Sequence, residues 1–150
     1  MNRFHLTLSL PLFAAACKDP VILESYLGVI HISPNDGAVN ISTEAYPSAI
    51  FSEALIESSV TPQHAYIEDA TGTPIDADVA YNSSTIRLSL TPLDLLDQNS
   101  DYTFVLTSGL VGADSGSLLG EIRTEFTTAG GGVPANQPPT ANAGDDQTVA

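Results

Sequence analysis

Few residues in this chain could do chemistry, and the most conspicuous of them is its single cysteine. Cys17 stands in the stretch PLFAAACKDP, with three alanines before it and a lysine after it. One cysteine excludes an intrachain disulfide framework and a multi-cysteine zinc site. A catalytic thiol would need a neighbouring base, and the sequence offers none that can be assigned to it. Burial as a small side chain and covalent attachment remain as roles for Cys17.

Oxygen-bearing side chains with some of the spacing of a calcium loop occur in the stretch DADVAYN. Asp76, Asp78 and Asn82 could supply oxygen ligands. An EF-hand loop needs a further oxygen ligand and then a glycine, where Ala80 and Tyr81 stand. We therefore expect at most weak, loosely bound calcium here, and a solvated acidic strand face is the simpler interpretation.

Histidine and serine add little further chemistry. His31 and His64 lie in separate segments without an H-x-x-x-H or H-x-H spacing, so the sequence predicts no zinc site. Ser115 in GADSGS resembles a serine-protease nucleophile loop, but no His–Asp context surrounds it, and a turn between strands explains it better. We predict no catalytic residue, no metal site and no cofactor.

The charge balance excludes one large class of partner. The chain has 4 Lys and Arg against 18 Asp and Glu, a formal net charge of −14. Phosphate backbones would repel such a protein, so we expect no nucleic-acid binding. Pairs of carboxylates are unavoidable in so acidic a chain and do not indicate a glycosidase.

The first residues have the order of regions found in a secretory signal peptide. In MNRFHLTLSLPLFAAAC, a basic Arg3 precedes a short apolar stretch and then small residues. The apolar stretch is shorter than the roughly 20 residues of a transmembrane helix. Residues 1–16 are therefore predicted to be a signal peptide; the alternative is a buried N-terminal helix or strand of the mature protein.

The stretch LFAAAC resembles the lipobox of bacterial lipoproteins, although Ala14 stands where that family usually has leucine. The resemblance implies that Cys17 becomes the acylated mature N-terminus and attaches the protein to a membrane, and Lys18 implies the outer membrane. Residues 17–28 would then be anchor and spacer. The alternative is ordinary cleavage after Ala16, which would make the protein secreted or periplasmic.

The middle of the chain consists of short segments in which apolar and polar residues alternate, separated by turn residues such as PNDG. This period-two pattern is typical of antiparallel sheets with one face in water. Single-turn helical connectors are expected within Ser52–Val60 and Thr91–Asn99. The candidate strands are Tyr26–Ser33, Ala38–Ser42, Ser48–Ser52, His64–Asp69, Ile75–Asn82, Ser84–Thr91, Asp101–Gly109 and Glu121–Thr128.

Residues 29–128 resemble the bacterial Ig-like domain of S-layer proteins of the SbsA type. The matching residues are Pro34, Asp36, Gly37 and Val39, then Phe51, Ser52, Glu53 and Leu55, then Leu90, Pro92, Leu96, Tyr102 and Leu106, and last Asp114, Gly116, Leu118, Phe126 and Thr127. The resemblance implies a single all-β domain, an Ig-like antiparallel β-sandwich. It also implies structural roles for Gly37 and Phe51, and for Tyr102 in a tyrosine corner.

The C-terminal residues differ in composition from the rest. Residues 129–138 are mostly Gly, Ala and Pro and are predicted to be a semi-flexible, disordered linker. The N-terminal signal is predicted to be disordered as well. Residues 139–150 resemble the opening strand of a PKD-like Ig module, so they are expected to begin a second domain that is truncated here.

These observations together predict a non-enzymatic module of a cell-envelope lipoprotein on the outer membrane or cell surface. It would serve as a structural spacer or as an interaction or adhesion domain within a larger multidomain surface protein. Its partners would be the membrane, through lipid at Cys17, and a protein or neighbouring Ig-like modules. The alternative is the non-catalytic front end of a secreted hydrolase whose catalytic domain follows residue 150.

Overall fold

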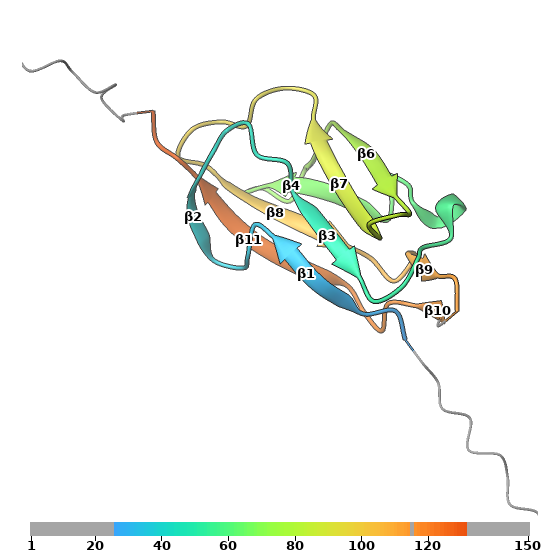
Figure 1. The fold of residues 1–150 in the computed structure, drawn as a ribbon. Coiled ribbons are helices and arrows are strands. Elements are labelled where there is room, and N and C mark those ends of the chain that lie inside the picture. Colours follow the sequence, from blue (N-terminus) through green and yellow to red (C-terminus); the bar gives the residue numbers. More distant parts are fainter. Residues whose placement is uncertain (1–25, 115, 132–150) are drawn as a thin grey trace, which may run out of the picture.

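The computed structural model describes residues 26–114 and 116–131, which form a sandwich of two β-sheets (Figure 1). The four-stranded sheet has the order β1 (Val29–Ser33), β3 (Ser48–Phe51), β7 (Arg87–Pro92), β6 (Ala77–Asn82). The five-stranded sheet has the order β2 (Ala38–Ile41), β11 (Ile122–Thr128), β8 (Asp101–Leu106), β4 (Ala65–Asp69), β5 (Pro74–Ile75). A two-stranded hairpin consists of β9 (Val111–Gly112) and β10 (Gly116–Ser117). The predicted all-β sandwich is confirmed.

The core lies between the sheets and is built from every second residue of the strands. In β8, Tyr102, Phe104 and Leu106 are buried. Phe51 of β3 is among the largest fully buried side chains, at 0% exposure. Because successive side chains of a strand point to opposite faces, the alternation in the sequence predicts this core correctly. Val105 is buried too, although it faces outward, between Tyr66 and Arg123 in register on the neighbouring strands.

The segment predicted as one strand, Ile75–Asn82, is divided between the two sheets. Residues Pro74–Ile75 pair with β4, whereas Ala77–Asn82 pair with β7 of the other sheet. Ile75 and the alternate residues of β6 nevertheless all pack against the common core. Alternation reports which side chains are buried and not which sheet holds them, so the sequence pattern could not reveal the change of sheet at Asp76.

The two predicted helical connectors have different outcomes. Within Ser52–Val60 there is one 3-10 turn, η1 (Glu57–Ser59). Within Thr91–Asn99 the prediction is wrong: the segment continues β7 to Pro92 and then forms turns without a helix. The N–H of Leu96 donates to the carbonyl of Thr43 at 3.0 Å, so this loop is held by contacts to another loop and not by local helical bonds.

The described chain enters the sandwich at one end and leaves it at the opposite end (Figure 1). At the entry, the N–H of Leu27 donates to the carbonyl of Ser117 at 3.2 Å. At the exit, the N–H of Ala129 donates to the carbonyl of Ile41 at 2.7 Å, and the N–H of Asn99 donates to the carbonyl of Ala129 at 3.2 Å. Backbone hydrogen bonds therefore tie both ends of the module to its body.

Candidate functional site

Several predicted features lie outside the described residues: the signal peptide, Cys17, all but the last part of the predicted spacer, Ser115, and the chain after Gly131. No helix in residues 26–114 and 116–131 is long and apolar enough to cross a membrane.

Gly37 lies in the turn between β1 and β2, at a φ of +73° that side chains rarely adopt. The turn is closed by the N–H of Ala38, which donates to the carbonyl of Asn35 at 3.0 Å. It is also bound to β11 from both directions: the N–H of Gly37 donates to the carbonyl of Glu125, and the N–H of Glu125 donates to Asp36 Oδ1 at 2.9 Å. This turn positions β2 against the strand that leaves the domain.

Tyr102 is buried in the core with its hydroxyl at the base of the β7–β8 loop. The hydroxyl accepts a hydrogen bond from the N–H of Asp97 at 2.9 Å, five residues upstream, which is the contact expected for a tyrosine corner. The ring stacks on Phe126 of β11, with centroids 5.9 Å apart. Tyr102 thus holds the β7–β8 loop to the five-stranded sheet.

A second tyrosine performs a similar task that the sequence did not reveal. The hydroxyl of Tyr81 on β6 accepts a hydrogen bond from the N–H of Leu55 at 2.8 Å, in the loop that follows β3. The ring of Tyr81 packs against the core, and the hydroxyl at its tip makes this polar contact. No local sequence signal identifies Leu55 as its partner, because the two residues are 26 positions apart.

The residues considered for metal binding do not come together. Asp78 is exposed on β6, and Asp76 is exposed directly before that strand. Asn82 Oδ1 instead accepts the N–H groups of Ser84 and Thr85, which makes it part of a turn. In the two described ranges, no group of three or more His, Cys, Asp or Glu side chains could hold a metal ion.

His31 and His64 are also apart. His31 is exposed on β1, at the edge of the four-stranded sheet. His64 precedes β4, and its Nδ1 lies 2.8 Å from the carbonyl oxygen of Ser59, which makes it a donor to the 3-10 turn. The imidazole packs directly against Gly109, where an added Cβ would overlap it. His64 therefore joins the connection between β3 and β4 to the β8–β9 loop.

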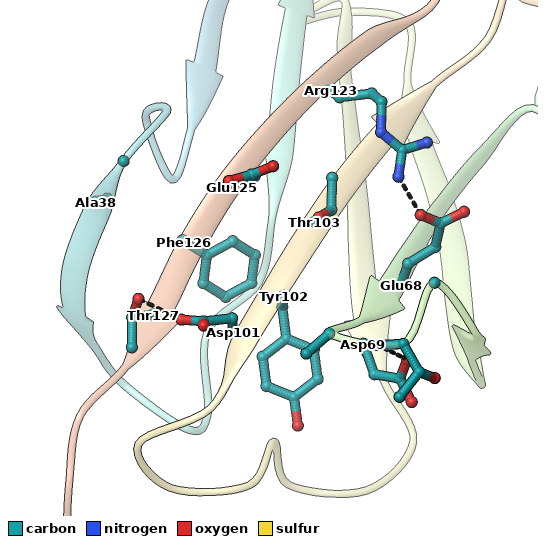
Figure 2. A pocket seen from close by; sticks show the side chains of 14 residues that line it. Ala38, Glu68, Asp69, Asp101, Tyr102, Thr103, Arg123, Glu125, Phe126 and Thr127 are labelled. Atoms are coloured by element: carbon teal, nitrogen blue, oxygen red, sulfur yellow. Dashed lines mark hydrogen bonds and ion pairs between the residues drawn. The ribbon is translucent and has the colours of Figure 1, made fainter.

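A depression with a volume of about 530 Å³ lies on the outer face of the five-stranded sheet (Figure 2). Its floor is formed by outward-facing residues that lie in register across β4, β8 and β11: Glu68, Thr103 and Glu125. Asp101 and Thr127 form the next row, with the Thr127 hydroxyl donating to Asp101 Oδ1 at 2.6 Å. Alternation predicts that these side chains face outward, but only the register brings them together.

Arg123 is the cation of this face. It forms ion pairs with Glu68 of β4 and with Glu121, the latter at 2.9 Å. The hydrogen bonds that Arg123 donates to Glu121 and Glu68 raise the pKa of Arg123 above its usual value. Burial, together with the carboxylates of Glu68 and Glu121, raises the pKa of the Tyr66 hydroxyl.

At the rim of the depression, Asp69 organises the turn between β4 and β5. Its Oδ1 accepts hydrogen bonds from the Thr71 hydroxyl at 2.6 Å, the Thr71 N–H at 2.8 Å and the Thr73 N–H at 2.9 Å. The hydrogen bond from the Thr71 hydroxyl, then that from the Thr73 backbone, lowers the pKa of Asp69. Three carboxylates that line this depression, those of Glu68, Asp69 and Asp101, thus already have partners within the protein.

Comparison with solved structures shows the same fold in several bacterial proteins. Surface layer protein SbsC, domains 1–6, is 20% identical with a TM-score of 0.52; the match covers 69% of this chain and 14% of SbsC. CopC from Methylosinus trichosporium OB3b is 16% identical with a TM-score of 0.55, covering 71% of this chain and 96% of CopC. PcoC, a methionine-rich copper resistance protein from Escherichia coli, is 18% identical with a TM-score of 0.55, covering 69% of this chain and 99% of PcoC.

These likenesses concern the fold. The chain spans only about one seventh of the SbsC structure to which it is similar. No curated protein matches the sequence. The family comparison is more direct, because residues 24–128 match the family described as bacterial Ig-like domain. This range agrees closely with residues 29–128, which the sequence resemblance singled out, and the chain belongs to the bacterial Ig-like domain family.

Proposed function

We propose that this chain is a non-enzymatic spacer module of an exported envelope protein that is attached to the membrane by lipid at Cys17. The observation that carries the proposal is the position of the two ends of the described chain, which lie at opposite ends of the sandwich (Figure 1). A module with this arrangement adds its length to whatever precedes and follows it. β11 alone has 7 residues, which span about 23 Å at roughly 3.3 Å per residue.

The hydrogen bonding of β11 suits a module that transmits tension. The chain leaves through this strand, which pairs with β8 in antiparallel register from Ile122 to Thr127 and with β2 in parallel. Inter-strand hydrogen bonds are roughly perpendicular to the strands, so a pull along β11 loads many of them at once in shear. The exit is therefore better protected against pulling than a strand that could be peeled off one bond at a time.

The N-terminal part of the proposal rests on the lipobox-like stretch before Cys17. One acyl chain binds a membrane only marginally, whereas several bind stably, at about 0.8 kcal/mol for each buried CH₂ group. Cleavage before Cys17 removes Arg3 and no acid, so the mature net charge becomes 3 − 18 = −15. An acidic module of this kind would stay soluble outside the membrane that holds it. The likeness in fold to an S-layer protein is consistent with a place on the cell surface.

Lipid attachment is tested by growing cells with a labelled fatty acid and comparing the wild-type chain with Cys17→Ser. The chain has no other cysteine, so the substitution removes every thiol. We expect label on the wild-type protein alone, and the variant to retain its leader or to appear in the soluble fraction. Equal labelling of both proteins, or of neither, would refute attachment at Cys17 and favour plain secretion.

The spacer role is tested separately with an epitope tag placed after Ala150. In one variant, residues 26–131 are deleted and the flanking residues joined; in another, they are replaced by an unrelated Ig-like sandwich with its ends at opposite poles. We expect antibody binding to whole cells to fall on deletion and to return with the replacement, since a spacer contributes length and not specific contacts. If the replacement fails to restore access, the module has a specific partner and is not a simple spacer.

A further inference from the structure

Three exposed apolar side chains gather around one depression at the end of the sandwich where the chain leaves. Tyr46, Leu93 and Leu95 are 64%, 61% and 69% exposed, and all three line a depression of about 350 Å³. We call these three residues the exit patch. Scattered apolar residues are normal on a protein surface, but a cluster around a hollow is a candidate interaction site.

The exit patch lies beside the point where the chain leaves. Tyr46 belongs to the β2–β3 loop, and Leu93 and Leu95 belong to the β7–β8 loop. Ala129 is hydrogen-bonded to the end of β2, where the β2–β3 loop begins, and to the β7–β8 loop: its N–H donates to the carbonyl of Ile41, and its carbonyl accepts from the N–H of Asn99. In Figure 1 these two loops rise at the same end of the sandwich as the end of β11.

The segment of this chain that follows the exit has the composition that such a patch would bind. Residues 133–139 read VPANQPP, and no charged residue occurs between Ala129 and Gly144. The depression is bordered by the carboxylates of Glu44 and Asp94, beside which the amide N–H₂ groups of Asn136 and Gln137 could donate. A second copy of the chain would instead bring a further net charge of −14 to this acidic surface.

The segment can reach the patch. Val133 is four residues beyond Ala129, a reach of at most about 14 Å for an extended chain. Leu95 is four residues from Asn99 and Tyr46 is five from Ile41, so both lie within a similar chain length of the exit. A proline-rich segment already prefers the extended polyproline conformation, so that docking in an aromatic-lined groove costs it less conformational entropy than it would cost another sequence.

We propose that Val133–Pro139 docks on the exit patch in a polyproline conformation, with its apolar side chains covering Tyr46, Leu93 and Leu95. The joint between this module and the residues that follow would then be stiff, and it would point in a set direction. This proposal deepens the spacer role, because a docked segment would extend the rigid length of the module. Docking of this segment requires neither export nor lipid at Cys17. The docking proposal can therefore be refuted while the proposal of lipid attachment at Cys17 still holds.

The experiment is a measurement of backbone amide order parameters by ¹⁵N relaxation on the chain from Lys18 to Ala150. Rigid backbone gives values of about 0.85 and flexible chain gives values below about 0.6. We expect the rigid range for Val133 and for Ala135 to Gln137 in the unaltered chain. In the double variant Leu93→Ser, Leu95→Ser we expect the same amides to fall below about 0.6. Both leucines are exposed, so the amide spectrum of the sandwich should be preserved.

A matched control uses Leu119→Ser, which removes another leucine, 77% exposed, from the opposite end of the described domain. This variant should leave the order parameters of residues 133–137 unchanged. Flexible values in the unaltered chain would overturn the proposal, as would rigid values that survive loss of both patch leucines. Order that appears only as the protein concentration rises would also overturn it, because the patch would then bind a second copy.

Discussion

Replacing Tyr102 by phenylalanine tests how much the Tyr102 hydroxyl contributes to holding the β7–β8 loop. The substitution keeps the ring, and with it the stacking on Phe126 at 5.9 Å. It removes the acceptor of the hydrogen bond from the N–H of Asp97, at 2.9 Å. The packing of the core is therefore unchanged, and the change in the free energy of unfolding reports the hydrogen bond.

The size of the effect follows from the surroundings of the two atoms. An intramolecular hydrogen bond contributes about 0.5–1.5 kcal/mol net, and a buried donor left without a partner costs about 1–3 kcal/mol. Tyr102 is 6% exposed, but Asp97 is exposed, so water can partly replace the lost acceptor. We therefore expect Tyr102→Phe to cost about 1 kcal/mol, at the lower end of the second range. For a domain of about 100 residues this lowers Tm by roughly 4 °C.

The measurement is denaturant and thermal unfolding of the wild type and the variant, followed by circular dichroism. Tyr46→Phe is the matched control, because it removes the hydroxyl of a tyrosine that is 64% exposed in the same part of the fold. We expect no change in the control. The reasoning is refuted if Tyr102→Phe changes the free energy of unfolding by less than about 0.3 kcal/mol, or if the two variants behave alike.

Two further predictions concern the loops. Gly109→Ala should lower the free energy of unfolding by about 2 kcal/mol, since the new Cβ overlaps the His64 imidazole. The loss should be smaller when Gly109→Ala is introduced into a His64→Ala variant, which lacks the imidazole. An equal loss in both proteins would contradict the contact. An NMR titration should find the pKa of Asp69 below its ordinary value, and Thr71→Val should raise it. Because that pKa is lowered by folding, the contribution of Asp69 to stability is present above the ordinary aspartate pKa of about 3.9 and is lost as pH falls through the folded-state value. A pKa that Thr71→Val leaves unmoved would show that the hydroxyl is not its cause.

Much of the sandwich could be predicted because its pattern is local. The alternation in DYTFVL places Tyr102, Phe104 and Leu106 in the core, as β8 does in the structure. Turn chemistry also acts over a few residues, so Gly37 could be recognised in PNDG as the residue for a positive φ. Where a prediction depended on non-local contacts it was wrong, as in Thr91–Asn99, where a helical connector was expected and the loop is held by Thr43 and Tyr102.

The sequence by itself determined the all-β class, the inward-facing residues and the position of Cys17 after a short apolar stretch, since each depends on residues close together in the chain. Only the tertiary structure decided that Arg123 pairs with Glu68, 55 residues away, because that contact depends on the register of β4, β8 and β11. It also decided that the chain changes sheets at Asp76 and that Ala129, where the chain leaves, is hydrogen-bonded to Ile41 and Asn99. Strand order is set by the burial of all strands together, and no segment of the sequence carries that information alone.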